Sequence, residues 1–159
     1  MYKRQSSQRH SYDVLGDAVS TTARLESQCK AYGVLLIIGP ETMARTKNDF
    51  FYLKLDDLAV KGKTIGLDIY TVLNKSYPNA KKTHDQMHEL YKNQKFKDAI
   101  RLCNKLKGEF DSQMDKYYDM WIDRCEYMST QKLSKDWNGV FVACLLYTSP
   151  SPRDHPPSR

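Results

Sequence analysis

The sequence lacks the features that mark membrane-spanning or disulfide-stabilised proteins. No apolar run approaches the roughly 20 residues needed to cross a bilayer, and the sequence shows no targeting segment. The chain has four cysteines without a Cys-x-x-Cys pair or other paired spacing, namely Cys29, Cys103, Cys125 and Cys144. Neither a zinc site nor a disulfide framework is therefore predicted. We expect reduced thiols and a cytoplasmic location, with any membrane attachment only through a preceding N-terminal region.

Proline is scarce except at the C-terminus, where the last ten residues hold four of the six. This tail mixes proline with serine and arginine, a composition typical of disorder. Residues 1–5 and 144–159 resemble translated sequencing-adapter sequence, so neither segment is expected to belong to the fold, and the chain is expected to be an internal fragment. Without these ends the net charge falls from +6 to +3, with 21 basic and 18 acidic residues. Nucleic acid is therefore not an expected partner.

The remaining chain divides into two parts. Residues 6–74 combine short apolar strands with helical periodicity and predict an α/β unit with a mixed sheet. A linker is expected at residues 75–81. Residues 82–143 predict helices, with apolar stripes facing each other across a turn near Asn93 and a third helix through Tyr117, Trp121 and Cys125.

Residues 12–27, YDVLGDAVSTTARLES, predict a strand, a tight turn and a helix. Gly16 tolerates any φ at the turn, and Asp17 is a good N-cap for a helix that starts there. Gly33 is suited to the C′ position after its last turn. Residues at spacings of three and four predict the buried stripe of this helix: Leu15, Ala18, Thr22, Leu25, Cys29 and Tyr32.

Ser20 and Arg24 lie four residues apart on the other face of this predicted helix, and Asp13 ends the strand before it. A helix N-terminus favours anions, and a guanidinium group binds phosphate oxygens through several donors. The combination suits a nucleotide. A solvated helix face with a capping residue explains the same residues without a ligand.

Three further segments predict strands. The apolar run at residues 34–38 has the character of a central strand covered on both faces. Apolar residues at positions 51, 53 and 55 alternate with Tyr52, Lys54 and Asp56, so one face should be buried and the other solvated. Residues 67–73 alternate likewise and predict an antiparallel partner.

The turn between the last two strands, residues 61–64, contains Lys61, Gly62 and Lys63. Glycine allows close approach of a backbone to a ligand, and the lysines supply charge for a triphosphate. An ordinary solvated turn is the alternative.

Two other patterns are weak candidates for metal sites. His84 and His88 are four residues apart, but Asp85 stands where a zincin motif has glutamate, so an ordinary helix face is the simpler prediction. Asp56 and Asp57 could hold a cation, although a strand end before a turn explains them better.

The pattern at residues 12–27 resembles the signature of class III nucleotidyl cyclases, the adenylate and guanylate cyclase catalytic domain. The resemblance extends over about residues 7–73, from Gln8-Arg9 through Tyr32-Gly33 to VKGK at residues 60–63. It implies an α+β sandwich, a ferredoxin-like half-domain with a mixed or antiparallel sheet. The helical region resembles a TPR-like hairpin, followed by WNGV at residues 137–140, as in some bacterial sensor-linked cyclases.

The resemblance implies conversion of ATP to 3′,5′-cyclic AMP and pyrophosphate. Asp13 matches the adenine-selecting position, Arg24 the transition-state arginine, and Lys63, with its neighbour Lys61, a contact to the terminal phosphates. Ser20 stands where the family usually has a ribose-orienting asparagine. The family's two Mg²⁺ or Mn²⁺ ions bind aspartates of the first half-domain, which has no counterpart here. The chain would act with a homodimer partner domain and is not expected to form cyclic AMP alone.

Two other functions fit the same residues. A catalytically degenerate cyclase half could bind nucleotide or dimerise without turnover, as the exchange at Ser20 suggests. Alternatively, the TPR-like region could be the working part of an interaction protein that binds a protein partner, with the α/β unit as its platform.

Overall fold

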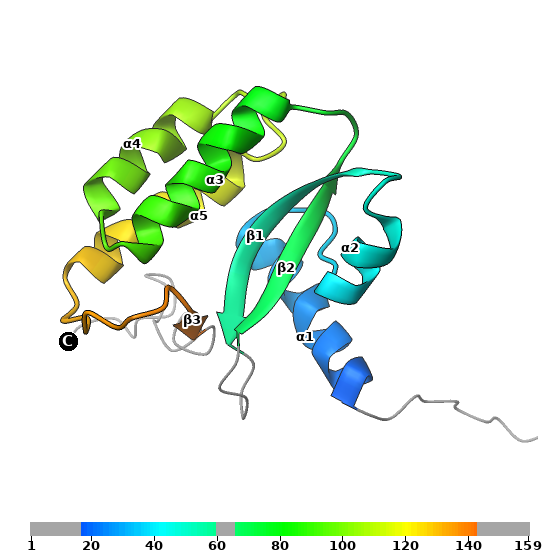
Figure 1. Ribbon diagram of the computed structural model, residues 1–159, viewed down its shortest axis with the longest axis horizontal. Helices are drawn as coiled ribbons and strands as arrows, with labels where there is room; N and C mark the ends of the chain where they lie inside the picture. The colour runs from blue at the N-terminus through cyan, green and yellow to red at the C-terminus, as the bar shows by residue number, and fades with distance from the viewer. Residues whose placement is uncertain (1–16, 60–65, 143–159) are drawn as a thin grey trace, which may run out of the picture.

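The computed structural model describes residues 17–59 and 66–142, a mixed α/β arrangement of five helices and a small sheet (Figure 1). The elements follow one another as α1 (Asp17–Tyr32), α2 (Pro40–Thr46), β1 (Phe51–Ala59), β2 (Gly66–Leu73), α3 (Pro78–Lys92), α4 (Phe96–Leu106), α5 (Asp115–Ser129) and β3 (Phe141–Val142). Within the described residues, no helix is both long enough and apolar enough to cross a bilayer.

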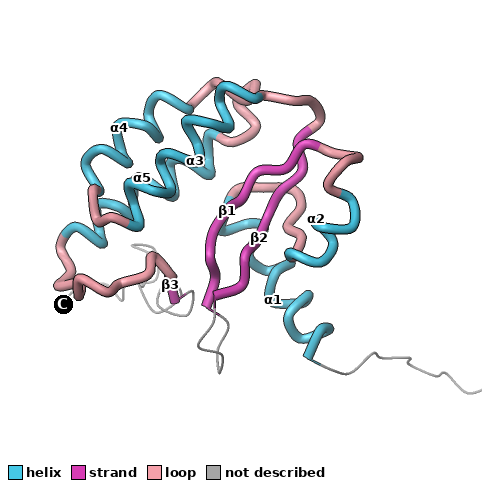
Figure 2. The backbone as a smooth tube through the Cα atoms, viewed as in Figure 1, coloured by secondary structure: helices cyan, strands magenta, loops and turns pink. Residues whose placement is uncertain are grey.

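The strands are ordered β2-β1-β3, with β1 antiparallel to β2 and parallel to the short β3. This confirms the predicted antiparallel pair. On β2, Ile69, Thr71 and Leu73 are buried at every second position, as the alternation predicts. Figure 2 shows α3, α4 and α5 as one group beside β1, with α2 beside β2.

The alternation on β1 is interrupted by a β-bulge. Lys54 pairs with Tyr70 and Asp56 pairs with Ile69, so Leu55 has no partner on β2. One extra residue turns the following side chain to the other face of the sheet. Leu55 and Asp56 are consequently both buried, and the expectation that Asp56 lies on the solvated face with Lys54 is wrong.

Residues 34–38 do not form the predicted central strand. Only Ile38 is paired, through an isolated antiparallel bridge to Tyr70 in which each backbone N–H donates to the other residue's carbonyl. Leu35 is fully exposed and Leu36 about half exposed. A central strand needs a neighbouring strand along each of its two edges. The described part of the chain supplies only β2 at this position.

The helix α1 ends as its sequence predicts. Gly33 has φ of +67° and donates its N–H to the Lys30 carbonyl, while Val34 donates to the Cys29 carbonyl. These two bonds form a Schellman motif, which satisfies the last carbonyls of the helix. Leu25 and Tyr32 of the predicted stripe are buried and Cys29 is half-buried, whereas Thr22 is exposed, contrary to the prediction.

The helical region begins at Pro78, inside the stretch 75–81 expected as a linker, because proline fits the first turn of a helix. Helices α3, α4 and α5 pack consecutively around an aromatic core that includes Tyr91, Trp121 and Phe110. After α5 the WNGV segment returns to the sheet: Trp137 packs against Tyr91, with ring centroids 5.1 Å apart, and Phe141 begins β3. The predicted helix turn near Asn93 and the third helix are confirmed.

Candidate functional site

The predicted nucleotide-binding residues are only partly within the described chain. Ser20 and Arg24 both belong to α1, and Arg24 is exposed, as expected for a residue outside the buried stripe. Asp13, Lys61 and Lys63 lie outside the described residues. In Figure 1 the first turn of α1 lies toward the same lower end of the view as the ends of β1 and β2 that flank residues 60–65.

A buried polar junction, formed by Tyr32, Asp56 and Arg124, was not anticipated from the sequence. Arg124 of α5 donates from Nη1 to Asp56 Oδ2 at 2.5 Å and from Nη2 to the Tyr32 hydroxyl at 3.3 Å. The Tyr32 hydroxyl in turn donates to Asp56 Oδ2 at 2.6 Å. All three residues are at least 97% buried, with exposed fractions of 1%, 2% and 3% for Tyr32, Asp56 and Arg124.

The charges in this junction are mutually compensated. Burial acts to lower the pKa of Arg124, but the Asp56 carboxylate together with Tyr32 and Tyr91 leaves the pKa raised, so the guanidinium stays protonated. Burial, reinforced by Asp56, raises the pKa of Tyr32, so its hydroxyl remains a donor. The guanidinium also lies over the rings of Trp121, at 4.5 Å, and Phe141, at 4.3 Å, in cation–π contact.

One signal in the sequence marks Arg124. The buried residues of α5 include Tyr117, Trp121 and Met128, and position 124 falls on the same stripe at spacings of three and four. A charged residue on an otherwise apolar stripe requires a buried partner. No comparable signal marks Asp56, because its burial depends on the bulge at Leu55.

The two histidines form a second buried polar cluster, with Tyr117 and Tyr118, where α3 and α5 meet the edge of β1. His84 Nε2 lies 2.6 Å from the Lys54 carbonyl, so this nitrogen must carry the proton, and Nδ1 accepts from the Tyr118 hydroxyl at 2.8 Å. The Tyr117 hydroxyl donates to the Leu55 carbonyl at 2.5 Å. The two histidines lie on one face of α3, and His84 is on its buried side, completely enclosed.

His88 extends this cluster toward the surface. Its Nε2 lies 3.1 Å from the Tyr117 hydroxyl and 3.2 Å from His84 Nε2. Burial lowers the pKa of His84 to about 4, and burial together with the neighbouring His84 lowers the pKa of His88 well below its ordinary value. Both imidazoles are therefore neutral near pH 7. A neutral ring offers one donor and one acceptor, as the hydrogen bonds of this cluster require.

Asp57 belongs to a cluster on the opposite face of the sheet from Asp56. Lys54 Nζ bridges Asp57 and the cross-strand Asp68 at 2.7 and 3.0 Å, and Lys92 reaches Asp57 at 3.2 Å. A cleft of about 160 Å³ adjoins these residues and His88. Because Arg124 compensates Asp56 and two lysines compensate Asp57, these carboxylates do not form the cation site that their adjacency suggested.

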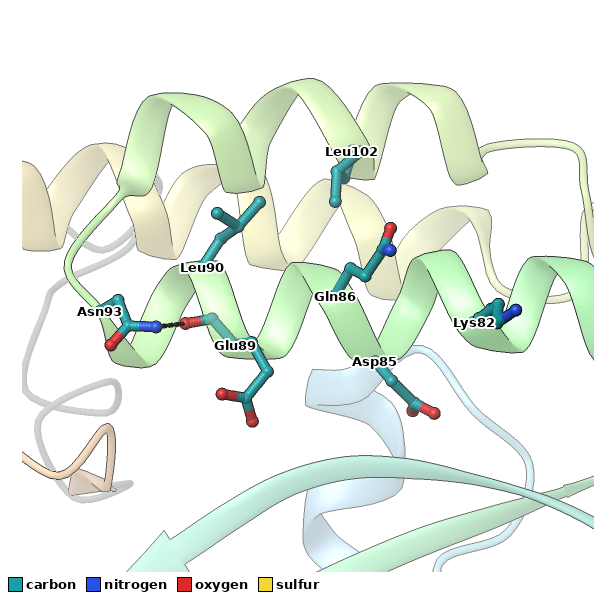
Figure 3. Close-up of a pocket in the computed structure, with 7 residues that line it drawn as sticks. All are labelled: Lys82, Asp85, Gln86, Glu89, Leu90, Asn93 and Leu102. Atoms are coloured by element: carbon teal, nitrogen blue, oxygen red, sulfur yellow. Dashed lines mark hydrogen bonds between the residues drawn. The ribbon is translucent and has the colours of Figure 1, made fainter.

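A wider groove lies on the outer side of α3, where it meets α4 (Figure 3). It has a volume of about 620 Å³. Gln86 and Leu90 point toward Leu102 of α4, whereas Asp85 and Glu89 project toward the strands (Figure 3). Asp85 is held by Lys81 at 2.9 Å. The groove is open, and its lining combines charged, amide and leucine side chains, so its residues do not define one ligand.

The residues that the structure describes do not provide the metal site that the cyclase resemblance implies. Among residues 17–59 and 66–142, no three His, Cys, Asp or Glu side chains gather into a group able to hold a metal ion. Asp56 is committed to Arg124, and Asp57 and Asp68 to Lys54. Two divalent ions do not fit these carboxylates.

Comparison with protein-family models, curated proteins and solved structures gives no match to the chain. The described part of the site is an exposed arginine on α1, whose C-terminal end is anchored by a buried arginine from α5. A guanidinium in such a position can bind phosphate oxygens and stabilise charge that develops on them.

Proposed function

We propose that the chain contributes the base-selecting, transition-state and phosphate-binding residues of a class III adenylate cyclase. In this proposal it converts ATP to cyclic AMP together with a partner domain, which supplies the aspartates for Mg²⁺ or Mn²⁺. The observation that carries the proposal is the predicted succession of helix and hairpin. The helix α1 bears Ser20 and Arg24, ends at Gly33, and is followed by the antiparallel β1 and β2, which flank Lys61 and Lys63.

Each residue has a separate role in the proposed reaction. The Asp13 carboxylate accepts a hydrogen bond from the adenine amino group and disfavours the carbonyl of guanine. Lys63, with Lys61 beside it, holds the terminal phosphates. Arg24 stabilises the negative charge that grows on the α-phosphate as the ribose 3′-oxygen attacks and pyrophosphate leaves. Ser20 contacts the ribose, directly or through a water molecule, with a shorter reach than asparagine.

The helical region is proposed to be a TPR-like element of the same protein. Its three consecutively packed helices support this proposal, and the groove between α3 and α4 offers a surface for a protein partner.

A cyclase-like domain without turnover is the second candidate, favoured by one observation. Ser20 replaces the usual asparagine of the signature, so the contact that orients the ribose is weaker. Such a domain would bind ATP and dimerise but would not accelerate cyclic AMP formation.

Complementation of a damaged cyclase tests the two candidates directly. The purified chain is mixed with a class III protomer that keeps its metal-binding aspartates but lacks its own transition-state arginine, and cyclic AMP is measured with ATP and Mn²⁺. We expect activity with the unmodified chain, a loss of about 10³-fold or more with Arg24→Ala, and weaker discrimination against GTP with Asp13→Asn.

Arg101→Ala provides the matched control, because Arg101 is also an exposed helical arginine and pairs only locally with Asp98. It should leave activity unchanged. ATP binding without any activity, also after Ser20→Asn, would favour the domain without turnover. Absence of ATP binding by the chain would contradict both candidates.

A further inference from the structure

Arg124 connects three segments that are distant in the sequence. Its guanidinium donates to Asp56 on β1 and to Tyr32, the last residue of α1, and packs against Phe141 on β3. The second oxygen of Asp56 accepts from the Asp57 backbone N–H at 2.8 Å, so the carboxylate is fixed in orientation. Arg124 is thus one of the buried side chains that join the helical region to the α/β unit, and its hydrogen bonds reach both α1 and β1.

The end of α1 is held by this contact and by close backbone packing. A Cβ added at Gly33 would lie 2.5 Å from Lys116 Cβ and 3.4 Å from the Tyr117 backbone nitrogen, so α5 lies directly against the end of α1. Among the described side chains of α1, Leu25 and Gln28 are also buried. The buried side chains described on α1 therefore all lie in its C-terminal half, from Leu25 to Tyr32.

A small change in the tilt of α1 about its C-terminal end displaces the residues that precede it. Arg24 lies about 12 Å and Ser20 about 18 Å along the helix axis from Tyr32, at 1.5 Å per residue. A tilt of about 10° would then move these positions by roughly 2 and 3 Å. Displacement of a catalytic group by about 1 Å can cost a factor of 10² in rate.

We propose that Arg124, acting through Tyr32 and Asp56, is a positioning residue for the nucleotide site: it fixes the angle of α1 against β1 and thereby the place of Arg24. The proposal rests on the proposed function, since it concerns the site that binds ATP. It assigns to the helical region a part in substrate binding, although none of its residues needs to touch the nucleotide.

The mildest test removes one hydroxyl. Tyr32→Phe deletes the hydrogen bonds of the Tyr32 hydroxyl to Arg124 and Asp56 but keeps the Arg124–Asp56 pair. Tyr118→Phe is the control: it also deletes one buried tyrosine hydroxyl, whose hydrogen bond to His84 joins α5 to α3, whereas the two bonds of the Tyr32 hydroxyl join α1 to α5 and β1. ATP affinity is measured by calorimetric titration, and thermal unfolding is measured on the same samples.

We expect Tyr32→Phe to weaken ATP binding about tenfold, whereas Tyr118→Phe of similar thermal stability binds like the unmodified chain. Hydrogen exchange should become faster in residues 21–31 of α1 and stay unchanged in β1. Arg124→Met alone leaves Asp56 buried without its partner and could prevent folding. The double variant Asp56→Leu with Arg124→Met removes both charges, and we expect it to fold and to bind ATP as weakly as Tyr32→Phe.

The possible failures are distinguishable. An unmodified chain that does not bind ATP overturns the proposed function. An unmodified chain that binds ATP, with Tyr32→Phe and the double variant both within twofold of it, overturns only the positioning role of Arg124. Equal losses in Tyr32→Phe and Tyr118→Phe would likewise overturn it, because they would reflect stability alone.

Discussion

Gly33 and Gly139 each lie where a helix packs directly against the backbone. Gly33, with φ of +67°, meets α5, and Gly139, with φ of +82°, leaves only 2.6 Å between an added Cβ and Lys92 Cγ. Both combine a left-handed backbone with a close approach, a combination that only glycine tolerates without displacement. The first joins α1 to the helical region, and the second belongs to the WNGV segment that returns the chain to the sheet.

At Gly33 we predict that alanine is strongly destabilising. The positive φ costs about 1 kcal/mol, and the contact with Lys116 adds roughly 1–3 kcal/mol because it involves Cβ rather than a flexible side-chain end. Gly108→Ala is the comparison, since Gly108 has φ of +88° and open space around it. Urea unfolding should show a larger loss for Gly33→Ala; equal losses would show that α5 does not press against this position.

At the scale of elements, the edge of β1 is closed in two ways. Its final residues Leu58 and Ala59 pair with β3, while the Lys54 and Leu55 carbonyls accept hydrogen bonds from His84 and Tyr117. An open strand edge is a template for aggregation, and side chains from α3 and α5 remove that hazard here. The bulge at Leu55 lies in the part of the edge that these side chains cover.

His84 makes this closure sensitive to acid. Its pKa is about 4 when folded, because of burial, and about 6.5 when unfolded. Between these values the unfolded chain binds a proton that the folded chain excludes, so the free energy of unfolding falls as the pH is lowered. The expected loss between pH 7 and pH 5 is about 2 kcal/mol for this histidine, with no change above pH 7.5.

Urea unfolding at pH 7, 6 and 5 measures this loss. His84→Gln keeps a donor and an acceptor but does not titrate, so its stability should depend less on pH. The remaining dependence is expected from His88, whose pKa is lowered as well. A slope identical to that of the unmodified chain would mean that His84 is accessible to protons in the folded state.

At the scale of the whole molecule, the helical region and the sheet form a single packed unit. Arg124, His84 and Tyr117 each link α3 or α5 to β1, and the aromatic core continues from Tyr32 to Tyr117, with ring centroids 6.4 Å apart. The connection between β2 and α3 covers only residues 74–77. A hairpin of helices cannot bury its own apolar face, and here the sheet covers part of it.

We therefore predict that the chain stays together when the connection is cut. A protease site is introduced at Lys75 and Ser76, which are exposed. After cleavage the two pieces should elute as one particle of unchanged size, because the buried network and β3 hold them. The same sample in concentrated urea should separate, which confirms that cleavage was complete. Separation under native conditions would show that the two parts are independent domains.

Local features of the fold were predictable from the sequence because they depend on neighbours along the chain. The C-terminal end of α1 followed from Gly33, the β1–β2 pair from alternation, and the three later helices from stripes such as Met87, Tyr91 and Phe96. The segment at residues 34–38 was predicted wrongly, since apolar composition alone does not supply the strands that a central strand needs on both sides. For the candidate site, the sequence predicted the exposed position of Arg24 on α1.

The sequence by itself determined the C-terminal end of α1, the pairing of β1 with β2, the three later helices, the exposed position of Arg24, and which residues resemble a nucleotide site. Only the tertiary structure decided the fate of Asp56, Arg124 and His84. Asp56 is buried because one bulge shifts the alternation of β1, and it is stable there because Arg124, 68 residues later, meets it. Burial of a charge depends on a partner that is near in space, and local periodicity carries no information on which distant residue that is.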